Sequence, residues 1–241
     1  MASNSGKSTG TRPLWLTVLG FVTLAAFLVG AWYALVMAPT EVTQQELFRI
    51  TYTHASVAAV ALAATILTAV FGAMVLWRGK PIDDVRTVAA AEVTTVFLAV
   101  TVIGGMIYSK PTLGAYWAWD ARITLSGIML VLMVGYFVVR GMIGDPLRAA
   151  RVSAVVALIV AAGAPLNRAA TSMFRTVHPA RSADMPAELQ FVLIINMVAA
   201  LLVFAWFFLE RARLGAIEAR LEAEREGLEA GSSSVKEVVN V

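Results

Sequence analysis

The chain contains two histidines and no cysteine, so the metal chemistry open to it is narrow. Without a thiolate, the sequence excludes thiol catalysis, iron–sulfur clusters, cysteine-ligated zinc and covalent attachment of a c-type haem. The only imidazoles belong to His54 and His178. Two imidazoles on separate elements can supply two axial bonds to one metal ion between them. Each can also be an interfacial histidine with a hydrogen-bond partner.

An aromatic segment lies between the two histidines in the sequence. Tyr116, Trp117 and Trp119 fall within four residues, and Asp120 and Arg122 follow at once. Aromatic rings are common at membrane interfaces, but this density next to two charged residues also suits a flat, apolar ligand with anionic groups. Iron protoporphyrin is flat, metal-centred and carries two carboxylates, so it meets these requirements.

Six apolar segments must position these residues. About 20 apolar residues cross a bilayer core of ~30 Å, and the backbone must be helical there to pair its own polar groups. The predicted spans are residues 14–38, 52–77, 85–107, 123–139, 149–166 and 188–209. The first is too long for a signal-peptide core, so we expect it to be retained. The sequence therefore predicts an all-α polytopic membrane protein, with a six-span membrane domain over residues 1–209.

The charged residues set the expected orientation. Fifteen per cent of the residues are charged, compared with about 25% in a typical soluble domain. Ten basic residues near span ends fall on one side: Lys7, Arg12, Arg78, Lys80, Arg86, Arg140, Arg148, Arg151, Arg211 and Arg213. Six fall on the other: Arg49, Lys110, Arg122, Arg168, Arg175 and Arg181. The positive-inside rule predicts that the first set and both termini are cytoplasmic. Residues 39–51, 108–122 and 167–187, and with them both histidines, then face outward.

The last part of the chain differs from the spans. Residues 210–241 are rich in charge, with Leu214, Ile217, Leu221 and Leu228 at helical spacing. This pattern predicts a cytoplasmic amphipathic helix that continues the sixth span. It can be a solvated extension or a short coiled-coil contact with a partner. The small net charge of +3 gives no indication of nucleic-acid binding.

Residues 110–124, KPTLGAYWAWDARIT, resemble the tryptophan-rich WWD signature of haem-handling proteins, in the form carried by the CcmC family of cytochrome c maturation. The segment that ends in His54, with Arg49 and Tyr52, is similar to the segment before that family's first haem-ligand histidine. Thr176 to His178 is similar to the segment around the second. The resemblance covers roughly residues 45–209.

The resemblance implies a role for each candidate residue. His54 and His178 are the expected axial ligands of one haem b on the outer face of a bacterial cytoplasmic (inner) membrane, and Trp117, Trp119 and Tyr116 line it. Arg122 can bind a propionate bidentately, or it can form a local ion pair with Asp120 that shapes the loop. Arg49 can serve the other propionate, or extend to the interface from a span entrance.

The resemblance also implies a function in haem export without an ATPase site on this chain. The expected partners are the haem chaperone CcmE, the ATP-binding-cassette subunits CcmA and CcmB, the small membrane protein CcmD, and membrane lipid. Two alternatives remain open. One is a single-haem membrane b-type cytochrome, although such proteins usually hold their ligands within spans. The other is a transporter of a different anionic solute, for which Gly104, Gly105 and Gly163 are the only broken-helix indications.

Overall fold

The computed structural model describes residues 11–39, 44–174, 177 and 186–239. Its elements are α1 (Leu14–Trp32), the π-helical η1 (Tyr33–Met37), α2 (Phe48–Arg78), α3 (Pro81–Leu113), α4 (Ala121–Met142), α5 (Pro146–Met173) and α6 (Ala187–Val239). Six helices, counting α1 and η1 as one, are long and apolar enough to cross a membrane. The predicted all-α, six-span architecture is therefore confirmed, while the orientation of the termini stays a prediction.

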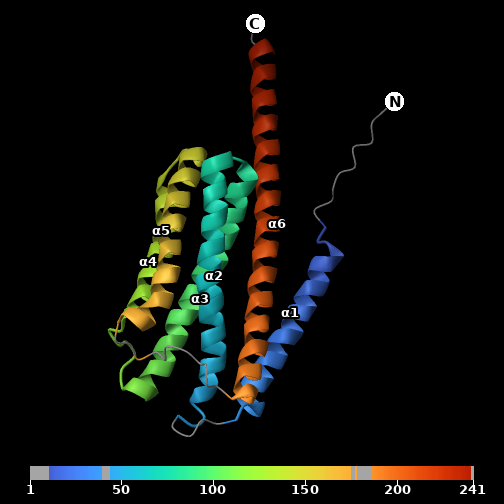
Figure 1. Cartoon of the computed structure of the whole chain (residues 1–241). Helices are drawn as coiled ribbons and strands as arrows, with labels where there is room; N and C mark the ends of the chain where they lie inside the picture. Colours follow the sequence, from blue (N-terminus) through green and yellow to red (C-terminus); the bar gives the residue numbers. More distant parts are fainter. Residues whose placement is uncertain (1–10, 40–43, 175–176, 178–185, 240–241) are drawn as a thin grey trace.

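Successive helices run in opposite directions (Figure 1). The end of η1, the ends of α3 and α5, and the starts of α2, α4 and α6 consequently lie at one end of the bundle, and α6 extends beyond the other helices at the opposite end. Helix α6 is continuous past residue 209, as expected for a tail that prolongs the sixth span. The end that holds the starts of α2, α4 and α6 is called the loop end below, and the opposite end is called the tail end.

Helix boundaries follow from a few residues with special backbone chemistry. Gly79, with φ of +62°, ends α2, because glycine enters the left-handed region without a steric penalty. Pro81 then begins α3, and Pro146 begins α5 behind the cap residue Asp145. Proline suits the first helical turn, where its missing N–H would have had no intrahelical partner. Helix α4 begins after a second aspartate cap, Asp120.

Two predicted span ends were wrong. We expected the third span to end near residue 107 and the fifth near 166, but α3 continues to Leu113 and α5 to Met173. Each helix passes an internal proline, Pro111 or Pro165, which removes one hydrogen bond but does not have to end a helix. The first residues of two segments that we expected to face outward are therefore helical rather than loop.

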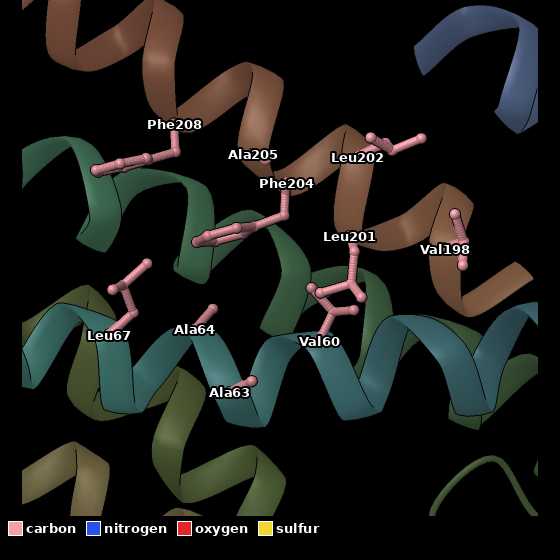
Figure 2. Close-up of a pocket in the computed structure, with 10 residues that line it drawn as sticks. All are labelled: Val60, Ala63, Ala64, Leu67, Val198, Leu201, Leu202, Phe204, Ala205 and Phe208. Carbon is pink, nitrogen blue, oxygen red and sulfur yellow. The ribbon is translucent and has the colours of Figure 1, made fainter. Parts of the chain in front are cut away.

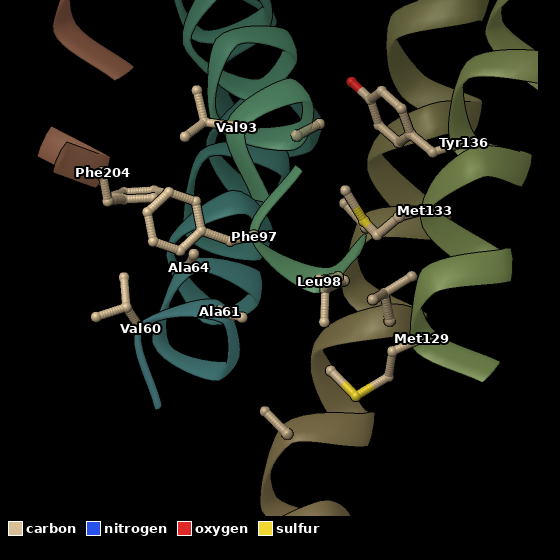
Figure 3. Packing of buried hydrophobic residues seen from close by; sticks show 14 of the residues in the cluster. Val60, Ala61, Ala64, Val93, Phe97, Leu98, Met129, Met133, Tyr136 and Phe204 are labelled. Atoms are coloured by element: carbon tan, nitrogen blue, oxygen red, sulfur yellow. The ribbon is translucent and has the colours of Figure 1, made fainter. Parts of the chain in front are cut away.

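The core lies where α2 to α6 meet (Figure 3). Phe97 of α3 contacts Phe204 of α6 edge-to-face with ring centroids 5.6 Å apart, and Met129 and Met133 of α4 are almost fully buried. A β-carbon at Gly163 of α5 would lie 2.7 Å from Met129 Cγ, so this glycine makes room for the methionine. Because lipid tails are as apolar as the core, close packing of this kind is what associates helices in a membrane. Gly163 therefore serves packing and does not indicate a broken transport helix.

Ion pairs fasten the bundle toward its tail end. Arg140 of α4 binds Asp84 of α3 through two hydrogen bonds of 2.9 and 2.6 Å. Arg211 of α6 binds both carboxylate oxygens of Glu92 in α3. Glu92, an ionisable residue within the third span, thus joins α3 to α6.

Candidate functional site

The loop end brings together the start of α2, the end of α3, the start of α4 and the end of α5 (Figure 1). His54 lies in the second turn of α2, the aromatic residues lie between α3 and α4, and Arg122 is the second residue of α4. His178 falls outside the described residues, as do Arg175 and Arg181. Its neighbour Val177 is described.

His54 lies against two glycines of the neighbouring helix α3. A β-carbon at Gly104 would be 3.4 Å from the imidazole Nδ1, and one at Gly105 would be 3.2 Å from Cε1. Any side chain at position 105 would therefore press on the ring. The glycine pair gives the half-buried imidazole a seat on the helix backbone, and this accounts for two glycines that the sequence left as possible transport features.

The aromatic segment folds back over the end of α3. Gly114, with φ of +79°, ends the helix, and the Ser109 hydroxyl donates a 2.8 Å hydrogen bond to the carbonyl of Ala115. Lys110 donates to the Gly114 carbonyl at 3.1 Å and lies 5.3 Å from the ring centroid of Tyr116. These contacts set the path of the backbone that leads to Trp117 and Trp119.

Trp117 and Trp119 occupy different environments. A β-carbon at Gly127 of α4 would lie 2.8 Å from Trp117 Cη2, so the Trp117 ring is seated against that helix. The two indoles meet edge-to-face with centroids 5.9 Å apart, while Trp119 is 87% exposed. Trp117 Nε1 is buried and has no hydrogen-bond partner among the described residues. A buried donor without an acceptor is unfavourable, and an anionic ligand group can satisfy it.

Asp120 holds two parts of the site together. Its Oδ1 accepts hydrogen bonds from the backbone N–H groups of Arg122 and Ile123 at 2.9 and 3.3 Å, which caps α4. Its Oδ2 accepts a 3.0 Å hydrogen bond from the backbone N–H of Val177. The carboxylate is only 6% exposed, so it joins the aromatic segment to the residue that precedes His178.

Arg122 is held by an asparagine that sequence reasoning missed. Its Nε donates to Asn167 Oδ1 at 3.2 Å, and Asn167 Nδ2 donates to the Arg122 carbonyl at 3.0 Å and to Ser126 Oγ at 2.9 Å. Asn167 is 1% exposed. No hydrogen bond from the terminal guanidinium nitrogens reaches an acceptor within the described ranges, so these nitrogens can bind an anion. The sequence did contain a signal for Asn167, because it is a polar amide directly after the apolar segment 149–166, where such side chains often form hydrogen bonds between helices.

Arg49 has protein partners of its own. Its guanidinium donates to the carbonyl of Leu35 in η1 and forms a 3.0 Å ion pair with Glu46. These bonds hold the start of α2 against the end of η1. Whether Arg49 also contacts a ligand stays a prediction.

A cavity away from the loop end lies between α2 and α6 (Figure 2). Its volume is about 530 Å³. Its lining residues are Val60, Ala63, Ala64, Leu67, Val198, Leu201, Leu202, Phe204, Ala205 and Phe208. None of these side chains can ligate iron or bind a carboxylate, so the candidate site is the surface at the loop end.

The residues at the loop end fit a flat, anionic, iron-containing ligand. An imidazole seated on glycines can donate to the metal, two indoles offer apolar surface, and Trp117 Nε1 and the Arg122 guanidinium can donate to carboxylates. Acidic or imidazole groups in sets of three or more do not occur close together in the part of the chain that the structure describes.

Comparison with known proteins agrees with the resemblance found in the sequence. The family model for CcmC, described as Heme exporter protein C, matches residues 3–226. Heme exporter protein C of Bradyrhizobium diazoefficiens is 30% identical over 166 residues, which is 68% of this chain and 61% of that protein. The Escherichia coli K12 protein of the same name is 28% identical over 166 residues, covering 68% and 66% of the two chains. The Haemophilus influenzae protein is 24% identical over 204 residues, 82% of each. The matched part thus spans just under two thirds of the first two relatives.

Proposed function

Because the chain belongs to the CcmC family, we propose that it binds haem b at the loop end and delivers it for cytochrome c biogenesis. One observation carries this proposal: the residue before His178 is hydrogen-bonded to Asp120 at the end of the tryptophan segment. The chain is multipass, and the surplus of basic residues at the tail end supports a loop end that faces outward from the cytoplasmic membrane.

In this proposal His54 and His178 are the two axial ligands. Trp117, Trp119 and Tyr116 pack against the porphyrin edge or face, and Trp117 Nε1 and Arg122 donate to propionates. Asp120 keeps the capped start of α4 and the His178 segment together. Arg49 is the candidate for the second propionate, provided that it exchanges its bond to Glu46.

The chain's task is to bind, orient and release its cargo rather than to change it chemically. Two imidazoles saturate the iron, so delivery requires that one of them leaves. Loss of the Asp120–Val177 hydrogen bond is the step that this chain contributes, because it lets the segment next to His178 move away from the tryptophans. The proposed receiver is the haem chaperone CcmE, which docks over Trp119. The energy source is the ATP-binding-cassette pair CcmA and CcmB, and CcmD completes the assembly.

The test is a visible absorption spectrum of the purified protein and its histidine variants. The expected wild-type spectrum shows bis-histidine haem, and both His54→Ala and His178→Ala lose or change the coordination. Addition of imidazole should restore the six-coordinate spectrum of His54→Gly. Thr53→Ala is the matched control, since it removes an exposed side chain from the same helical turn.

Two results would contradict the proposal. Wild-type protein that stays free of haem, even when produced with its partners and supplied with haem, would favour a transporter of another anionic solute. Haem that is unchanged in all histidine variants would show that the ligands lie elsewhere in the chain.

A further inference from the structure

A second groove, separate from the loop end, lies between α1 and α6. It has a volume of about 450 Å³ and is lined by Arg12, Thr17, Gly20, Phe21, Thr23, Leu24, Phe27, Val203, Trp206 and Phe207. Helix α1 packs against α6 and stands apart from the rest of the bundle, and the two helices diverge toward the start of α1 (Figure 1). The groove therefore opens on the surface that faces lipid.

Most of the groove is apolar. Phe21, Leu24 and Phe27 of α1 are 69%, 54% and 50% exposed. From Arg12 to Phe27 the groove follows fifteen residues of chain, or about 22 Å at 1.5 Å per residue. This exceeds the ~15 Å of hydrocarbon in one leaflet, so the groove is long enough for an acyl chain.

The tail end of the groove is polar and basic. Arg12 lies over the Trp206 ring, 5.7 Å from its centroid, and forms a 2.5 Å ion pair with Glu210. Glu210 also pairs with Arg213 at 3.7 Å, so its single charge is shared between two guanidinium groups. The side chain of Arg12 is 39% exposed and that of Glu210 only 17%. The more accessible charge at this end is therefore positive.

The indole of Trp206 lines the groove between its basic end at Arg12 and its apolar part. Its Nε1 donates a 3.2 Å hydrogen bond to the Leu16 carbonyl, and a β-carbon at Gly20 would lie 2.8 Å from Nε1. The ring is thus fixed against α1, with the guanidinium of Arg12 above it.

We propose that this groove binds an anionic phospholipid, with the phosphate at Arg12 and one acyl chain along Phe21, Leu24 and Phe27. The charge at the groove entrance selects this occupant over a zwitterionic lipid, whose phosphate is balanced by its own cationic group, and over an apolar helix of another chain, which has no anionic group to pair with Arg12.

The experiment is fluorescence quenching by brominated lipid in vesicles of phosphatidylcholine. A small fraction of the lipid is replaced by brominated phosphatidylglycerol or by brominated phosphatidylcholine. The part of the quenching that disappears in Trp206→Phe reports on the groove. Phosphatidylglycerol should quench this part with roughly fivefold higher affinity, the ratio expected for one basic residue near the surface.

Arg12→Gln should remove the preference. Arg78→Gln should keep it, because Arg78 lies at the same end of the bundle over a different indole, that of Trp77. Inorganic phosphate should not compete, since it has no acyl chain to bury.

Equal quenching by the two lipids, or a preference that survives Arg12→Gln, would overturn the proposal. The first comparison needs no variant of Arg12 and holds even if Arg12→Gln cannot be purified. Quenching by neither lipid would instead indicate that a helix of another chain fills the groove.

Discussion

The imidazole of His54 in α2 rests on Gly105 of α3, where a β-carbon would come within 3.2 Å of the ring atom Cε1. This relationship connects a proposed iron ligand to a backbone position on another helix. The orientation of the ring is thereby set by how closely α2 and α3 pack.

Gly105→Ala should alter the haem spectrum without unfolding the protein. The added methyl group pushes the imidazole by a few tenths of an ångström, and Gly105→Val should push it further. The expected result is a shift in the low-spin electron paramagnetic resonance signals that grows from alanine to valine.

Gly135→Ala is the matched control for that series. Position 135 of α4 has open space for a β-carbon, so alanine should add up to ~1 kcal/mol of helix stability and leave the haem signals unchanged. Identical signals in Gly105→Val and wild type would show that His54 does not bind the iron.

Asp120→Ala should loosen the segment before His178 as well as the start of α4. Loss of a helix cap costs about 0.5–2 kcal/mol, and here the bond to Val177 is lost too. Hydrogen exchange at the Val177 amide should become faster, and haem should be released more readily.

The control for Asp120 is Asp145→Ala. Asp145 caps α5 through the backbone N–H of Arg148 at 2.6 Å, at the other end of the bundle. Asp145→Ala should lower the melting temperature by about as much as Asp120→Ala does, and it should leave the rate of haem release unchanged. If both variants release haem equally fast, Asp120 acts only as a helix cap.

Trp117→Ala and Trp119→Ala should separate stability from delivery. Trp117 is packed over Gly127, so its loss should lower stability by roughly 2 kcal/mol, less than the 3–5 kcal/mol of a fully buried tryptophan. Trp119 is 87% exposed, so its loss should leave the melting temperature unchanged and slow haem transfer to the chaperone.

Trp77→Ala is the control for Trp119, because Trp77 is 85% exposed at the tail end. It should change neither the melting temperature nor the transfer rate. Transfer at the wild-type rate from Trp119→Ala would argue against docking over the tryptophan segment.

Asn167→Leu should destabilise the protein and also weaken haem binding. It leaves the Arg122 carbonyl and the Ser126 hydroxyl without the amide donor, at a cost of about 1–3 kcal/mol, and it releases the guanidinium. The measurement is haem affinity alongside melting temperature.

Asn196→Leu tests whether the effect of Asn167 is specific. Asn196 is also buried and donates to the Gly30 carbonyl at 3.1 Å, away from the candidate residues. A comparable loss of stability with unchanged haem affinity is expected. If both asparagine variants weaken haem binding equally, Asn167 acts only through the fold.

The sequence alone determined the six helices, because an apolar segment of ~20 residues has few other folds in hydrocarbon. An up-and-down path through six spans puts every second connection at the same end, so the sequence also predicted that the three segments expected to face outward lie at one end of the bundle. Two helix ends were misjudged at Pro111 and Pro165, since proline disfavours a helix interior without forbidding it.

Only the tertiary structure decided which residues meet. Four contacts join positions that are far apart in the chain. They are the packing of His54 against Gly105, the hydrogen bond from Val177 to Asp120, the hydrogen bond from Arg122 to Asn167, and the groove that Arg12 lines with α6. A soluble helix reveals its buried face by its polar pattern. In a membrane the lipid-facing and packed faces are both apolar, and close packing of small residues selects the neighbours. That selection depends on the shapes of two surfaces together, which the residue pattern of a single helix does not contain.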